Sequence, residues 1–199
     1  MIGIIDYGAG NLHSVVNALN YLKCDYRLIK KATDFKQVKK IILPGVGAFG
    51  YAVEQLKNKK LFEKVCEWIK LDKPYLGICL GMQLLFEHSE EAKGIYGFGI
   101  FKGIIKKFTR YKVPQIGWNR VKLVKACALV EPPSKNLFYY FLHSYYAEEV
   151  EDDLIIGITE YGVCYPSIIN KGNVYAVQFH PEKSGKRGLI MLKNWVERC

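Results

Sequence analysis

The sequence contains no apolar segment close to the roughly 18 residues that a transmembrane helix needs, so we expect no membrane partner. Its first residues lack the basic segment of a secretory signal peptide, and Asp6 interrupts the first apolar run, which predicts a cytoplasmic protein. Cysteine pairs and Cys/His groups with metal-site spacing are also missing. We therefore expect no metal and six reduced thiols: Cys24, Cys66, Cys79, Cys127, Cys164 and Cys199.

Acidic residues are few, with 19 Asp and Glu against 29 Lys and Arg, a formal net charge of +10. Bases are concentrated in Lys23–Lys40 and Phe101–Lys125, whereas His143–Asn170 has six acids and neither Lys nor Arg. Clustered bases attract anions, so this charge fits a solvated surface, a partner or phosphorylated-substrate site, or a nucleic-acid site. Because no helix-turn-helix, RNP motif or zinc finger accompanies it, we expect no nucleic-acid partner.

The chain has 199 residues and 50% hydrophobic content, so residues 1–199 are predicted to form one domain with a sizeable core. In the first half, apolar runs alternate with helical patterns, which predicts an open, mostly parallel α/β sheet flanked by helices. Strands are expected at Met1–Ile5, Tyr26–Ile29, Ile41–Leu43 and Pro74–Ile78, and helices at Leu12–Leu22, Ala52–Leu56, Leu61–Leu71 and Leu80–His88.

The second half is rich in strand-like segments, which predicts an added antiparallel region before a final helix at Gly188–Val196. These segments are Gly94–Lys107, Asn119–Val130, Leu137–His143, Leu154–Thr159, Val163–Ile169 and Val174–Phe179.

Gly77-Ile78-Cys79-Leu80-Gly81 stands where an apolar strand should end and a helix begin. A nucleophile on such a tight turn needs small residues two places before and after it, because the backbone passes closely there. Cys79 is therefore the candidate nucleophile. The alternative is a buried cysteine that packs as a small apolar residue.

A cysteine nucleophile needs a base, and His180 lies at the end of an apolar strand in Phe179-His180-Pro181-Glu182. Glu182 could orient the imidazole, since residues two apart in an extended segment share one side. Pro44-Gly45-Val46-Gly47 offers backbone N–H groups of Val46 and Gly47 for an oxyanion hole, with the Leu80 N–H as a further donor. Each segment could also be an ordinary turn.

PGVGAFG (Pro44–Gly50), GICLGMQLLFE (Gly77–Glu87) and QFHPEKS (Gln178–Ser184), in this order and spacing, resemble the triad-type, class I glutamine amidotransferases. The resemblance covers essentially the whole chain. Within that family, IDYGAGNL (Ile5–Leu12), IGWN (Ile116–Asn119) and FYYFLHSYY (Phe138–Tyr146) look most like the glutaminase subunits of imidazole glycerol phosphate synthases.

The resemblance implies that Cys79 attacks the side-chain amide of glutamine, while His180 moves the proton and Glu182 orients His180. The implied reaction needs no cofactor. The ammonia would pass to a (β/α)8-barrel cyclase partner, which forms imidazole glycerol phosphate and an aminoimidazole carboxamide ribonucleotide in histidine biosynthesis. The resemblance places Gly47, Gln83, His143 and Ser144 in the glutamine pocket. It places Asn11, Trp118, Asn119, Tyr140 and Lys183 toward the cyclase.

Relatives often carry a histidine where this chain has Gln115, two residues before Gly117-Trp118-Asn119. Similar glutaminase–cyclase pairs supply ammonia for modification of surface sugars, so the pathway stays open. A stand-alone cysteine hydrolase and a basic nucleic-acid-binding module are the alternatives of other classes. Because Phe101–Lys125 contains Trp118 and Asn119, we hypothesise that part of its charge serves docking to an acidic face of the cyclase.

Overall fold

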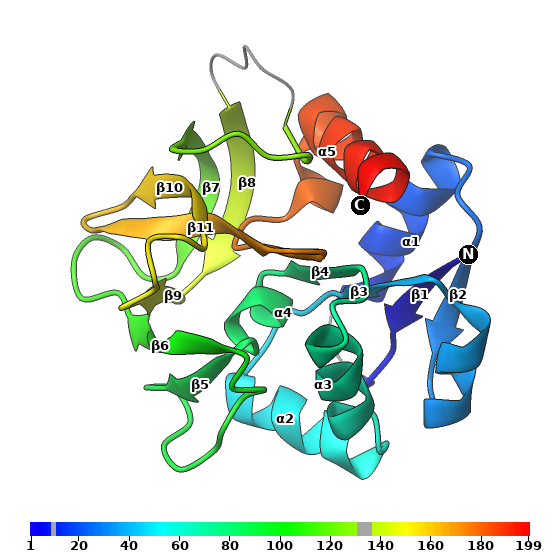
Figure 1. The fold of residues 1–199 in the computed structure, drawn as a ribbon. Helices are drawn as coiled ribbons and strands as arrows, with labels where there is room; N and C mark the ends of the chain where they lie inside the picture. The colour runs from blue at the N-terminus through cyan, green and yellow to red at the C-terminus, as the bar shows by residue number, and fades with distance from the viewer. Residues whose placement is uncertain (9–10, 131–136) are drawn as a thin grey trace.

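A computed structural model describes residues 1–8, 11–130 and 137–199, so residues 9–10 of the expected Gly-rich loop lie outside the described part (Figure 1). Five parallel strands form one half of a nine-stranded sheet. In spatial order they are β2 (Tyr26–Ile29), β1 (Ile2–Ile5), β3 (Lys40–Leu43), β4 (Tyr75–Ile78) and β12 (Val174–Val177). This half confirms the predicted parallel α/β arrangement.

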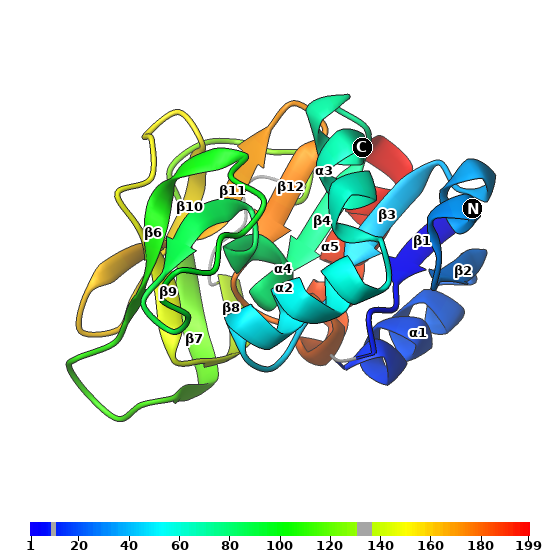
Figure 2. The same ribbon diagram turned by 90° about the horizontal axis from the view of Figure 1, so that it is seen from below.

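Four antiparallel strands continue the same sheet beyond β12. They are β11 (Cys164–Lys171), β10 (Ile155–Glu160), β7 (Gln115–Leu123) and β8 (Leu137–His143). A separate three-stranded sheet contains β5 (Phe86–Ser89), β6 (Phe101–Lys107) and β9 (Tyr145–Glu148). The strand-rich second half is thus an extension of the parallel sheet plus a smaller sheet beside it, as Figure 2 shows from below.

Helices cover both faces of the parallel half (Figures 1 and 2). On one face lie α1 (Leu12–Tyr21) and α5 (Gly185–Arg198), which bury Leu19 and Trp195 against β1 and β12. On the other face lie α2 (Phe49–Asn58) and α3 (Phe62–Lys70). Short 3-10 turns, η1 (Ala32–Gln37) and η2 (Pro181–Lys183), join elements at the edges of the sheet. Within the described ranges, no helix is both long and apolar enough to cross a bilayer.

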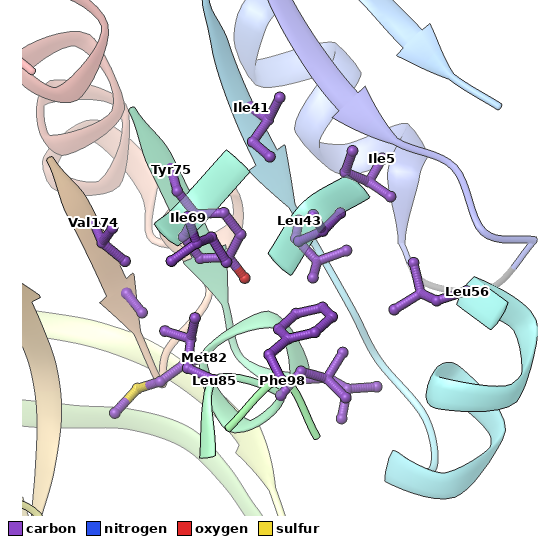
Figure 3. Close-up of a cluster of buried hydrophobic side chains, with 14 of the residues drawn as sticks. Ile5, Ile41, Leu43, Leu56, Ile69, Tyr75, Met82, Leu85, Phe98 and Val174 are labelled. Carbon is purple, nitrogen blue, oxygen red and sulfur yellow. The ribbon is translucent and has the colours of Figure 1, made fainter. Parts of the chain in front are cut away.

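The core has two layers because the inner parallel strands β1, β4 and β12 are buried on both sides. Figure 3 shows the layer under α2 and α3, to which β3, α2 and β4 contribute Leu43, Leu56 and Tyr75. This burial holds the carboxyl ends of β3, β4 and β12 side by side. Those ends carry the three motifs that the sequence singles out.

The helix predicted at Leu80–His88 is wrong beyond its first turn, since α4 spans only Leu80–Gln83 and β5 follows it. The carbonyl groups of Leu84 and Leu85 accept hydrogen bonds from Phe98 and Ile100, rather than from the next helical turn. Phe86 then pairs with Phe101 in the small sheet. Strand pairing with β6 therefore overrides the helical periodicity of this segment.

Other predicted strands differ mainly in their ends. The strand expected at Gly94–Lys107 starts only at Phe101, and the one expected at Asn119–Val130 runs from Gln115 to Leu123. The strand β9, at Tyr145–Glu148, was not expected separately; it pairs with β6 across the small sheet.

The turn from β4 to α4 depends on two glycines with no room for a side chain. A Cβ on Gly77 would lie 2.6 Å from the carbonyl oxygen of Gly81, and a Cβ on Gly81 would overlap the carbonyl oxygen of Leu43. The close backbone approach that the Gly-x-Cys-x-Gly spacing predicts is therefore present.

We expect Gly81→Ala to lower the free energy of unfolding by about 3 kcal/mol or more, because the new Cβ must displace the β3 backbone. Gly94→Ala is the matched control, since a Cβ there meets open space and only its positive φ is unfavourable, at about 1 kcal/mol. Urea unfolding of both variants measures the difference. Equal losses would show that the turn tolerates a side chain.

Candidate active site

Cys79 lies at the sharp turn between β4 and α4, with φ +53° and ψ −103°. A positive φ is uncommon for a residue with a side chain and is typical of strained functional turns. The Cys79 N–H donates to the carbonyl of Val177 at 2.8 Å, which ties the turn to the end of β12. The side chain is 5% exposed, so its sulfur is held in a nearly water-free site.

His180 and Glu182 follow the end of β12, beside the Cys79 turn. His180 Nδ1 donates to Glu182 Oε1 at 2.8 Å, and both side chains are almost fully buried. The His180 N–H donates to the carbonyl of Tyr140 at 2.8 Å, and the Ser184 hydroxyl donates to the His180 carbonyl. Pro181 starts η2, whose tight turn brings the carboxylate of Glu182 back to the imidazole.

The electrostatics of His180 favour the charged imidazolium. Burial by itself lowers the pKa of this group, but the negative charge of a Cys79 thiolate and the Glu182 carboxylate outweigh burial and raise the pKa to about 10. The other ring nitrogen, Nε2, is buried without a hydrogen-bond partner in the described part of the chain. It is therefore available for proton transfer. The structure thus brings the predicted Cys79, His180 and Glu182 together.

The predicted oxyanion turn lies next to Cys79, between β3 and α2. Gly47 has φ +120°, and a Cβ on Gly45 would meet Leu80 and the Tyr7 hydroxyl at 2.8 Å. The Leu80 N–H, however, donates to the carbonyl of Gly45 at 3.4 Å. The sequence predicts a free Leu80 N–H as an oxyanion donor, but in this structure the Gly45 carbonyl occupies it. The two groups meet because the turn after β3 packs closely against the start of α4.

The predicted glutamine-pocket residues lie around the same turn. Gln83 and His143 are buried, and both donate to the backbone carbonyl of Tyr145, from Nε2 at 3.0 Å and Nδ1 at 2.8 Å. Ser144 is half-buried, and its carbonyl accepts from the Phe108 N–H. Gln83 thus follows the Cys79 turn in α4, and the β8–β9 junction that carries His143 and Ser144 comes beside it through the Leu142 carbonyl, 3.7 Å from the Cys79 sulfur.

His143 is neutral at physiological pH. Burial is the main cause that lowers the pKa of His143 to about 4, and the nearby His180 adds to this lowering. The hydrogen bond from His143 to the Tyr145 carbonyl raises the pKa but only partly offsets burial. Because a carbonyl only accepts, Nδ1 carries the proton and Nε2 faces the Tyr165 hydroxyl at 3.3 Å. The Tyr165 hydroxyl in turn lies 2.8 Å from the amide of buried Gln115.

Sequence reasoning missed two buried residues at this site, Gln178 and Tyr165. The Gln178 side chain is fully buried and lies 3.5 Å from the Cys79 sulfur. Its place just before Phe179-His180 is a signal that could have found it, since the strand end is shared with the base. Tyr165 lies on β11 with no motif around it, so only the fold connects it to Gln115 and His143.

The residues predicted to face a partner occupy neighbouring elements at the active-site edge. Trp118 and Tyr140 are opposite each other on β7 and β8, with ring centroids 6.3 Å apart, and Trp118 is 58% exposed. Lys183 lies in η2, which packs against α1, where Asn11 caps the first turn through Ser14. Asn119 instead donates to the Glu160 carbonyl, so its side chain is committed within the chain.

The described part of the chain contains no cluster of three His, Cys, Asp or Glu side chains suited to a metal ion. All six cysteines are free thiols in this structure.

We expect the buried, neutral His143 to make stability depend on pH. Its folded-state pKa of about 4 lies below the ordinary 6.5, so the unfolded chain takes up the proton first as pH falls. Wild-type protein should therefore lose about 2 kcal/mol more unfolding free energy between pH 7.5 and 5 than His143→Asn. Urea unfolding at both values measures this, and parallel losses would contradict it.

The sequence profile described as "Glutamine amidotransferase class-I" matches residues 3–199. A protein of Methanocaldococcus jannaschii named "Imidazole glycerol phosphate synthase subunit HisH" is 50% identical over 198 residues, covering 99% of both chains. A protein of the same name from Bacillus cytotoxicus is 45% identical, covering 98% of this chain and 93% of its own.

Solved structures share the fold at low identity. The structure titled "Structure of PurLQS from Thermotoga maritima" superposes with a TM-score of 0.78 at 16% identity, covering 98% of this chain and 96% of that one. One titled "Crystal structure of glutamine amidotransferase" superposes with a TM-score of 0.77 at 14% identity, covering 98% of each. With its fold, its profile match and its relatives in agreement, the chain belongs to the class-I glutamine amidotransferase family.

Proposed function

We propose that residues 1–199 act as a single glutamine amidotransferase domain, the glutaminase subunit of an imidazole glycerol phosphate synthase. The observation that carries this proposal is the buried His180–Glu182 pair beside a cysteine held at positive φ. Such an arrangement suits attack on an amide, because the tight turn presents the sulfur at the carboxyl ends of the strands and a buried histidine can hold its proton.

The first step forms a thioester. The Cys79 sulfur attacks the side-chain carbonyl carbon of glutamine, and the carbonyl electrons move to oxygen, which backbone N–H groups of the Val46–Gly47 turn would stabilise. His180 then gives its Nε2 proton to the leaving nitrogen. The carbon–nitrogen bond breaks, ammonia departs, and the glutamyl group stays on Cys79.

The second step releases glutamate. Neutral His180 takes a proton from water as that water attacks the thioester carbon, and the carbon–sulfur bond then breaks. The thiolate of Cys79 and the imidazolium of His180 are restored together. Glu182 supports both steps, since its bond to Nδ1 keeps Nε2 directed toward the reacting atoms and stabilises the positive ring.

The names of the relatives support a role in histidine biosynthesis, with the ammonia passed to a cyclase subunit, over the alternative of surface-sugar modification. We propose a (β/α)8-barrel cyclase as the partner and glutamine as the substrate. We also propose a cytoplasmic location, because the relatives are named as subunits of a biosynthetic enzyme.

A docking face for that partner is supported by the exposed surface of β7 and β8. Trp118 is joined there by exposed Ile116 and Phe138, and solvent-exposed large apolar side chains in a group are typical of interfaces. Beside them, Arg120, Lys122, Tyr111 and Tyr161 line an open groove of about 980 Å³. The groove brings part of the basic segment next to the apolar face.

We expect Cys79→Ala to abolish glutamate release from glutamine, since no other described group is placed to form the thioester. The assay is best made with the cyclase subunit present, because the Leu80 N–H is occupied by Gly45 in the chain alone. Cys24→Ala is the matched control, because this half-buried free thiol precedes β2 at the amino ends of the parallel strands, opposite the edge that carries the triad. Unchanged glutamate release in Cys79→Ala would contradict the mechanism.

Reversal of Arg110, Lys112 and Arg120 to Glu should slow association with the cyclase and flatten the dependence of that rate on salt, because these exposed bases would steer docking. Stopped-flow measurements at several salt concentrations test this. The matched control reverses Lys36, Lys39 and Lys64, exposed bases distant from the triad, with the same change in net charge. Equal association rates for both triple variants would show that the basic segment has no specific role in docking.

A further inference from the structure

Gln178 is a fully buried polar side chain beside the nucleophile, two residues before the base in the sequence. It follows the last residue of β12 and precedes Phe179 and His180 by one and two positions. Its backbone N–H donates to the Ser167 carbonyl at 3.0 Å, so the segment is fixed to β11. Its side-chain Nε2 lies 3.5 Å from the sulfur of Cys79.

The direction of the Gln178 amide follows from its neighbours. The Tyr145 carbonyl can only accept, so the nitrogen of Gln83 must face it, at 3.0 Å. That same nitrogen lies 3.3 Å from the side chain of Gln178, so Gln178 must present its oxygen there. The Gln178 nitrogen is then left facing Cys79, and the group next to the sulfur is a hydrogen-bond donor.

The Tyr145 carbonyl is itself held in place. It accepts from Nδ1 of His143 at 2.8 Å as well as from Gln83. The Tyr165 hydroxyl contacts the other side of the His143 ring. A continuous chain of hydrogen bonds therefore runs from His143 through the Tyr145 carbonyl, Gln83 and Gln178 to the Cys79 sulfur.

The other polar group at the Cys79 sulfur shows why the Gln178 N–H is important. The Leu142 carbonyl oxygen lies 3.7 Å from the sulfur, where it can accept from the thiol but disfavours the thiolate. The Gln178 N–H does the reverse, since a hydrogen bond from a neutral donor is stronger when its acceptor is charged. We propose that Gln178 is a further catalytic residue, whose side-chain N–H stabilises the Cys79 thiolate against the thiol.

This inference rests on the proposed role of Cys79 as nucleophile, but its test does not use glutamine turnover. Iodoacetamide alkylates the thiolate, so the pH dependence of Cys79 alkylation, followed on its own peptide by mass spectrometry, reports the thiolate fraction. In Gln178→Met, which keeps the size and removes the donor, the apparent midpoint should rise by about one pH unit. Alkylation below that midpoint should slow about tenfold.

Gln178→Glu keeps the acceptor for Gln83 and puts a carboxylate beside the sulfur, so its midpoint should rise at least as far as in Gln178→Met. This variant preserves the test if Gln178→Met fails to fold by circular dichroism. Gln37→Met, an exposed change on η1, is the control and should leave the midpoint unchanged.

An unchanged alkylation midpoint in a folded Gln178 variant would overturn the proposal. Two other results together would separate the proposals. If the Gln178 variants raise the alkylation midpoint but Cys79→Ala still releases glutamate, the Gln178 contact is supported and the glutaminase mechanism is overturned. The two failures are therefore distinguishable.

Discussion

The positive φ of Cys79, at the junction of β4 and α4, is the constraint on which the rest of the site depends. A side chain at +53° is strained, so the surrounding backbone must hold it there. Gly77 and Gly81 make that possible, because the chain crosses itself and β3 at distances that no Cβ permits. The parallel strands bring β3 and β12 to the same edge, which supplies the oxyanion turn on one side and the base on the other.

The second requirement of the site is electrostatic. The triad is almost free of solvent, and a buried charge is unfavourable unless an opposite charge or a donor faces it. His180 lies between Glu182 and Cys79, so its positive form is stabilised from both sides, and Gln178 adds a donor to the sulfur. Neutral His143 lies close by and adds no competing charge. The site therefore concentrates charge on the atoms that react and keeps its neighbours uncharged.

The sequence was most informative where a local pattern has one physical cause. Alternating apolar runs predicted the parallel half, and the Gly-x-Cys-x-Gly spacing predicted the close approach at Cys79. It failed where partners distant in sequence decide the outcome. The segment around Phe86 has helical periodicity but pairs with β6, and Gln178 contacts Cys79 from 99 residues away. The engagement of the Leu80 N–H by Gly45 likewise depends on how β3 packs against α4.

We propose that Cys79 and His180 form a thiolate–imidazolium pair in the resting site. Nitrogen-15 NMR of the histidine rings in wild-type protein and Cys79→Ala tests it most directly, with Glu182 present in both. We expect the His180 ring to be protonated at neutral pH in wild type and its pKa to fall in Cys79→Ala, because the thiolate charge is gone. A His180 ring that is neutral at pH 7 in both proteins would contradict it.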